Sequence, residues 1–137
     1  MNTTVNSQSN ILVIPDNVTL FQDITNEKIY TIEAIEIITN FLDKVSKRNS
    51  IETSVLGLTF KDRIIDLNQI PYPDLKWLHY DNGSGYVKLT TFETAPTYLE
   101  LWKAAETVIE ESDDEDRVYI EGFNASDLEG VYSLFIS

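Results

Sequence analysis

The sequence predicts an α+β fold: a single domain in which two amphipathic helices pack on a mostly antiparallel sheet. Two long segments, 31–48 and 97–112, carry apolar residues at three- and four-residue steps, which is the spacing of one helix face. Several shorter segments have the length and apolar pattern of strands. Because the helical segments do not alternate one for one with these strands, a doubly wound parallel sheet is disfavoured.

The chain before the first helix is predicted to contain a tail and at least one strand. Residues 1–10 are polar and rich in Asn, Ser and Thr, so we expect a flexible tail there. The apolar run 11–14, which stops at Pro15, is typical of a buried strand. Residues 18–21 form a second candidate strand, and 23–28 are predicted to be a polar loop.

The first helix is predicted over 31–48. Thr31 can cap its N-terminus, and acidic residues precede basic ones along the segment, an order that the helix dipole favours. Its apolar face consists of Ile35, Ile38, Phe41, Leu42 and Val45.

Four strand-like segments are predicted between the two helices. They lie at 54–60, 63–67, 75–80 and 86–92. The last two flank the turn-rich stretch 81–85, which has the length of a hairpin connection.

The second helix is predicted over 97–112, where Thr97 and Glu100 have the spacing of a capping box. Its apolar side is formed by Tyr98, Leu101, Trp102, Ala105, Val108 and Ile109, and its opposite side by Glu100, Lys103, Glu106, Thr107 and Glu110. Strands are predicted to follow at 117–123 and 131–136.

Length and composition indicate the broad class of protein. A chain of 137 residues has the size of one domain, for which we expect the bounds 11–137. The absence of cysteine excludes disulfides, thiolate metal ligands and a cysteine nucleophile. The N-terminus lacks the basic and apolar regions of a signal peptide, and no apolar run approaches the roughly 20 residues that span a bilayer. We therefore expect a cytoplasmic protein that binds no membrane.

Negative charge is concentrated in the second half of the chain. Residues 1–70 contain nine Asp/Glu and six Lys/Arg, a net charge of −3, whereas residues 71–137 contain fourteen and four, a net charge of −10. Seven acids lie in the last turns of the second predicted helix and just beyond it: Glu106, Glu110, Glu111, Asp113, Asp114, Glu115 and Asp116. Helix carbonyls already carry partial negative charge there, so each exposed acid at the helix end costs about 0.3–1 kcal/mol. Either this run meets a positively charged partner, or it is a solvated helix end that keeps the protein soluble.

This acidity also restricts the possible partners. Nucleic acids and anionic membranes are excluded as direct partners, because their binding depends on Lys and Arg that neutralise phosphates. A basic protein is favoured instead. Trp77, Tyr80 and Tyr86 flank the turn at 81–85, and we expect them to be partly exposed and to serve as aromatic anchors for that partner.

The sequence contains no motif that indicates catalysis, a cofactor or a metal. His79 is the only histidine, and no neighbouring residue supplies a nucleophile or an orienting carboxylate. The acidic run does not fit a calcium-binding loop, because its sixth position is never glycine. The stretch 81–85 lacks the spacing of a phosphate-binding loop.

These observations favour a non-enzymatic acidic protein, a monomer or small homo-oligomer, that binds and blocks a basic protein. An immunity protein, or an inhibitor of a nuclease-type toxin or other nucleic-acid-binding protein, has this character, with carboxylates standing in for phosphates. One alternative is a structural or scaffolding module that pairs through the apolar strand 131–136, if that strand lies at a sheet edge. Another is an enzyme in which carboxylates from separate segments, such as Glu93 and Glu121, meet in a cleft.

Overall fold

The computed structural model describes residues 10–45, 63–114, 116–117 and 119–137, and it has the α+β architecture that the sequence predicts. In this part of the chain, two helices accompany eight strands in three mostly antiparallel sheets. In chain order the elements are β1 (Ile11–Val13), β2 (Phe21–Ile24), β3 (Glu27–Tyr30), α1 (Ile32–Val45), β4 (Ile64–Asp66), β5 (Trp77–Asp81), β6 (Val87–Thr91), α3 (Tyr98–Ser112), β7 (Ile120–Ala125) and β8 (Val131–Ile136).

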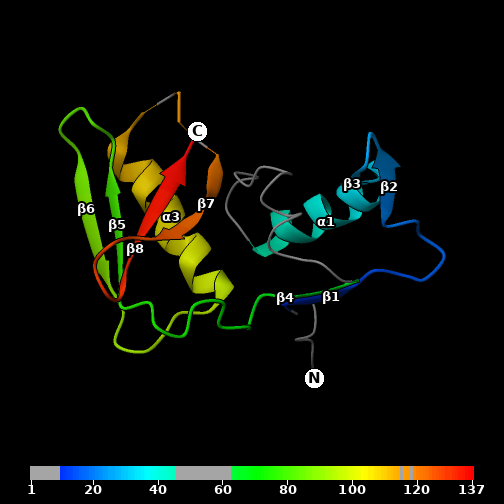
Figure 1. The fold of residues 1–137 in the computed structure, drawn as a ribbon, viewed down its shortest axis with the longest axis horizontal. Helices are drawn as coiled ribbons and strands as arrows, with labels where there is room; N and C mark the ends of the chain where they lie inside the picture. Colours follow the sequence, from blue (N-terminus) through cyan, green and yellow to red (C-terminus); the bar gives the residue numbers. More distant parts are fainter. Residues whose placement is uncertain (1–9, 46–62, 115, 118) are drawn as a thin grey trace, which may run out of the picture.

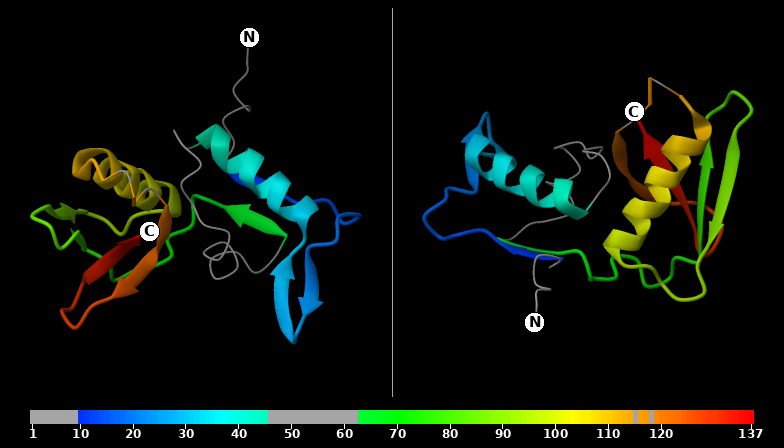
Figure 2. Two further views of the ribbon diagram at one scale, coloured as in Figure 1. Left: turned by 90° about the horizontal axis from the view of Figure 1, so that it is seen from above. Right: turned by 180° about the vertical axis from the view of Figure 1, so that it is seen from behind.

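The largest sheet has the strand order β6-β5-β8-β7. It consists of two antiparallel hairpins, β5–β6 and β7–β8, which are joined by a parallel pairing of β5 with β8. Helix α3 runs across one face of this sheet, between the two hairpins in the chain (Figures 1 and 2). Strand β8 is therefore an interior strand, so the scaffolding alternative, which required 131–136 at an edge, is wrong on this point.

The remaining strands form two small sheets rather than joining the large one. Strand β1 pairs antiparallel with β4, and β2 pairs antiparallel with β3. Figure 1 shows α1 and the β2–β3 hairpin on one side of the molecule, with the β1–β4 ladder below α1, and the large sheet and α3 on the other side.

The hairpin of β2 and β3 replaces the polar loop predicted at 23–28. Its two turn residues, Thr25 and Asn26, have φ of 54° and 69°. Such two-residue turns match the twist of the flanking strands, and Asn tolerates the left-handed region well. Because the residues of this turn and its neighbours are mostly polar, their composition indicated a loop and not two paired strands.

Both helices bury the faces that their periodicity predicts. In α1, Ile38, Phe41 and Leu42 are buried, and the hydroxyl of Thr31 accepts a hydrogen bond from the backbone N of Ala34 at 3.1 Å, as an N-cap does. Helix α3 begins with the predicted capping box. Its buried apolar residues are Leu101, Trp102, Ala105, Val108 and Ile109. The side chain of Val45 and the strand predicted at 54–60 lie outside the described residues, as does the tail predicted at 1–10 except for Asn10.

Neither helix in the described part of the chain has the length and apolar character needed to cross a bilayer.

Candidate interaction surface

The acidic run begins at the C-terminal end of α3. The last turn of this helix contains no basic residue, and Glu110 and Glu111 are both exposed. The helix ends at Asp113, which has φ 51° and ψ 37°, a left-handed C-cap conformation. Acids thus lie where the free carbonyls of the helix end present partial negative charge, and the helix dipole disfavours this placement.

One acid of the run, Glu111, is bound within the molecule. Its Oε1 accepts a hydrogen bond from the Tyr86 hydroxyl at 2.8 Å and one from the Lys88 ammonium at 3.0 Å. The hydrogen bonds from Tyr86 and Lys88 lower the pKa of the Glu111 carboxyl. Burial, followed by the bond to Glu111, raises the pKa of the Tyr86 phenol to about 12. These contacts hold the β5–β6 hairpin against the end of α3.

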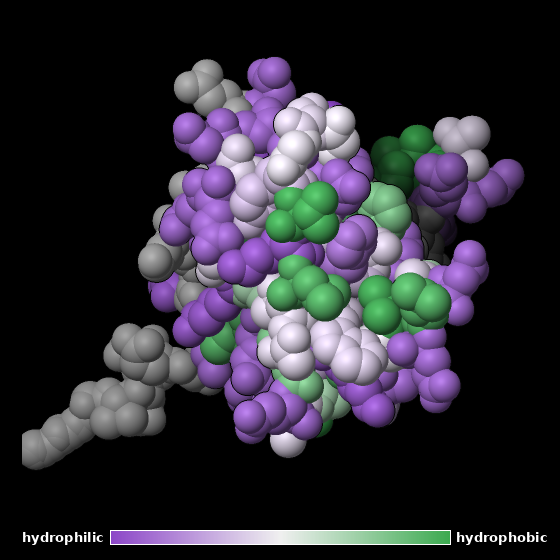
Figure 3. All heavy atoms as spheres, turned by 90° about the vertical axis from the view of Figure 1, so that its left-hand side faces the viewer, coloured by the Kyte–Doolittle hydropathy of each residue, from purple (hydrophilic) through white to green (hydrophobic). Residues whose placement is uncertain are grey.

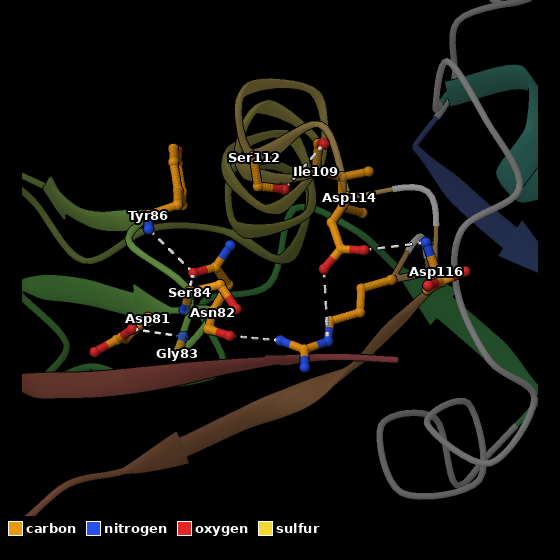
Figure 4. Close-up of polar contacts among 10 residues, drawn as sticks. Asp81, Asn82, Gly83, Ser84, Tyr86, Ile109, Ser112, Asp114 and Asp116 are labelled. Atoms are coloured by element: carbon orange, nitrogen blue, oxygen red, sulfur yellow. Dashed lines mark hydrogen bonds and ion pairs between the residues drawn. The ribbon is translucent and has the colours of Figure 1, made fainter.

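A second acid, Asp114, is also engaged. One of its carboxylate oxygens accepts a hydrogen bond from the backbone N of Asp116 at 3.1 Å, and the other lies 3.6 Å from Nε of Arg117. Arg117 donates in turn to the backbone carbonyl of Asn82 at 2.8 Å. Figure 4 shows the turn residues Asn82 and Gly83 on one side of these contacts and Asp114 and Asp116 on the other.

Glu106 does not belong to the exposed acidic surface, contrary to the prediction. Only 5% of it is exposed. It lies four residues after Trp102 and three before Ile109, both buried, so the helix turns it toward the margin of the buried face. A cavity of about 290 Å³ beside it is lined by Lys103, Glu106, Thr107 and Glu110.

Three acids of the run are therefore exposed without an ion pair among the described residues: Glu110, Asp113 and Asp116. Glu115 lies outside the described residues. The molecule's own cations compensate only part of the charge, at Glu111 and Asp114.

Three aromatic residues are predicted to be partly exposed anchors. For Tyr80 this prediction is wrong, because its side chain is buried. In β5, Leu78 and Tyr80 are buried, whereas Trp77 and His79 are half-buried and Asp81 is exposed. Alternation along a strand places the two sets on opposite faces of the sheet. Trp77 and Tyr86 remain partly exposed, as expected.

Sequence reasoning missed several surface residues on the sheet face opposite α3. Val87 and Leu89 in β6 and Phe135 in β8 are large apolar side chains that are exposed. Their alternation with polar or buried neighbours is visible in the sequence, but the pattern alone does not tell which face is covered by a helix.

His79, Glu93 and Glu121, which the sequence offers as candidates for acid–base chemistry, lie in or next to different parts of the large sheet. His79 lines a cavity of about 350 Å³ together with Asp81, Arg117 and Ser133. Glu93 follows β6 and Glu121 lies in β7, so these carboxylates belong to opposite edges of the sheet and do not form a pair. Among the described residues, no group of three or more His, Asp or Glu side chains is arranged to hold a metal ion.

Comparison of the chain with protein-family models, with curated proteins and with solved structures found no match.

Proposed function

We propose that this protein is a non-enzymatic interaction protein that binds and blocks a basic protein partner. The proposed class includes immunity proteins and other inhibitors of nuclease-type toxins or of nucleic-acid-binding proteins. The observation that carries the proposal is the exposed, uncompensated charge of Glu110, Asp113 and Asp116 at a helix end that disfavours it.

A basic partner would supply cations that this chain has in short supply. The chain has 23 acids and 10 Lys and Arg, so most of its carboxylates have no cation of their own. A cationic surface that approaches the end of α3 would satisfy both the exposed carboxylates and the partial charges of the helix carbonyls. Such charges steer encounter and accelerate association at low salt. A nuclease surface evolved to hold phosphates presents cations of this kind.

The proposal is tested by binding of fluorescein-labelled decalysine over a salt series, with decaglutamate as the negative control. One variant neutralises the three exposed acids, and a matched variant neutralises three exposed acids of the N-terminal part. Each loses three negative charges, so both change the net charge from −13 to −10. The first carries Glu110→Gln, Asp113→Asn and Asp116→Asn, and the second Asp16→Asn, Asp23→Asn and Glu33→Gln.

We expect the first variant to bind decalysine about 3- to 150-fold more weakly, because each of the three exposed ion pairs contributes ~0.2–1 kcal/mol, and to show a flatter salt dependence. The matched variant should stay within about twofold of the unmodified protein. Equal losses in the two variants would mean that only net charge matters, and the end of α3 would then have no special role.

A further inference from the structure

The large sheet has one face without a helix. Helix α3 covers the side on which Leu78, Tyr80, Tyr132 and Leu134 are buried. The opposite side, here called the open face, carries the alternate residues of three strands. These are Trp77, His79 and Asp81 from β5, Val87, Leu89 and Thr91 from β6, and Val131, Ser133 and Phe135 from β8.

Strand register places these residues in rows across the sheet. His79 is paired with Leu89 on one side and with Ser133 on the other. Trp77 is likewise flanked by Thr91 and Val131. The open face is thus one continuous surface rather than a set of separate positions.

The open face exposes large apolar side chains to water. Val87 is 58% exposed, Leu89 55% and Phe135 45%, and no described element packs over them. Figure 3, which views the side of the molecule on which β6 lies, shows hydrophobic side chains gathered within a hydrophilic surround. Single exposed apolar residues are ordinary, but a group on one sheet face marks an interaction site.

The charges around the open face are mainly negative. Asp81 lies within it, Glu93 follows β6, and Asp127 and Glu129 lie in the β7–β8 turn; all four are exposed. The nearby cations offset little of this negative charge, because most of them are already bound within the molecule.

Lys88 is bound to Glu111 on the α3 side of the sheet, and Arg117 is engaged by Asp114 and Asn82. Lys76, just before β5, is the remaining cation of the described sheet and its turns. A second copy of this chain would therefore meet like charge at the rim, whereas a basic partner would meet opposite charge.

We propose that the open face is the docking surface for a basic protein, in which Leu89, Val87 and Phe135 make the apolar contacts. The carboxylate of Asp81 lies among them, and the other three acids lie around them. This inference rests on the proposed function and adds a second contact surface for the partner, on the sheet face opposite α3, to the acidic end of that helix. An apolar centre with a polar rim is the usual anatomy of a protein interface. The acids accelerate association, and the buried apolar centre slows dissociation.

The test uses two labelled peptides of equal charge. One contains only Lys and Ser, and the other replaces half of the Ser residues with Leu and Trp. The open-face variant carries Val87→Ser and Leu89→Ser, and its matched control carries two exposed isoleucines from the other side of the molecule, Ile24→Ser and Ile32→Ser. All four positions are exposed, so both variants should keep the fold, which circular dichroism and thermal unfolding verify.

We expect the open-face variant to bind the Leu/Trp peptide at least tenfold more weakly and the Lys/Ser peptide unchanged. The control variant should bind both normally. Amide chemical-shift changes on addition of the Leu/Trp peptide should fall in β5, β6 and β8.

Failure of this inference is separable from failure of the proposed function. If neutralising the acids at the end of α3 weakens both peptides while the open-face variant matches its control, the inference alone is overturned. If the acid variant also has no effect, the proposed function is overturned as well. If light scattering shows that the protein self-associates and the open-face variant does not, a second copy occupies the face and the docking proposal is wrong.

Discussion

Gly130, immediately before β8, is the position where one added methyl group should have the clearest effect on stability. Its φ is +78°, and an added Cβ would lie 3.2 Å from Cζ3 of Trp77. Its carbonyl accepts hydrogen bonds from the backbone N of Lys76 at 2.8 Å and of Trp77 at 3.0 Å. The substitution Gly130→Ala therefore strains the backbone and pushes on the first residue of β5 at the same time.

Gly83 separates these two effects. It has almost the same φ, +76°, but nothing lies within 4 Å of the added Cβ. Gly83→Ala should therefore cost only the left-handed conformation, about 1–2 kcal/mol. Gly130→Ala adds a contact with a ring and with the backbone around it, which we expect to cost about 1 kcal/mol more.

Equilibrium unfolding in urea measures both values. We expect Gly130→Ala to lower the free energy of unfolding by about 2–3 kcal/mol, with an unchanged dependence on denaturant. For a chain of this size, that corresponds to a fall in Tm of roughly 5–12 °C. If the two variants lose equal stability, the Trp77 ring moves away from the added methyl group at no energetic cost. The prediction of an additional loss in Gly130→Ala is then refuted.

Three further predictions concern α3 and its contacts. Thr97→Ala removes the capping box and should lower the free energy of unfolding by about 1 kcal/mol, measured in urea; no loss would mean that water replaces the cap. Asp113→Asn should raise stability by ~0.3–1 kcal/mol, since it removes an unfavourable charge at a helix end, while weakening binding of decalysine; a loss of stability would contradict the dipole argument. Tyr86→Phe should raise the pKa of Glu111, followed by carbon NMR of the carboxyl. Because folding lowers the pKa of Glu111, its contacts stabilise the folded state at pH values above the ordinary carboxyl pKa. This stabilisation is lost as the pH falls through the pKa of the folded state. The free energies of unfolding of the variant and the unmodified protein should therefore differ most near neutral pH.

Much of the fold could be predicted because local signals agreed with it. The second helix has its capping box and its apolar spacing in one continuous segment, and both are properties of neighbouring residues. The bounds of β8, Val131–Ile136, are those predicted, because alternation and a preceding glycine mark them. Pairing between distant strands has no such local signal, so the division into three sheets and the interior place of β8 could not be read from spacing.

The candidate site was harder to predict than the fold, because exposure depends on what packs nearby. The acidic run is visible in the sequence. The burial of Glu106 is not, because this residue lies at the edge of the apolar face of α3, where a small rotation about the helix axis decides between burial and exposure. The partners of Glu111 come from a hairpin more than twenty positions away in the chain. Alternation in β5 assigns Trp77 and Tyr80 to opposite faces, yet only the position of α3 determines which of them is buried.

The parallel ladder between β5 and β8 divides the large sheet into two halves that differ in how they form. Each hairpin unites strands that are close in the chain, whereas the ladder has only three registered pairs, Trp77 with Val131 through His79 with Ser133. Closing it requires the chain to bring together segments more than fifty positions apart, and such late, long-range steps limit the rate of folding. The β5–β8 ladder should also be the first part of the sheet to open when the protein is destabilised. Hydrogen exchange at the amides of this ladder would then report partial unfolding of the sheet before either hairpin separates.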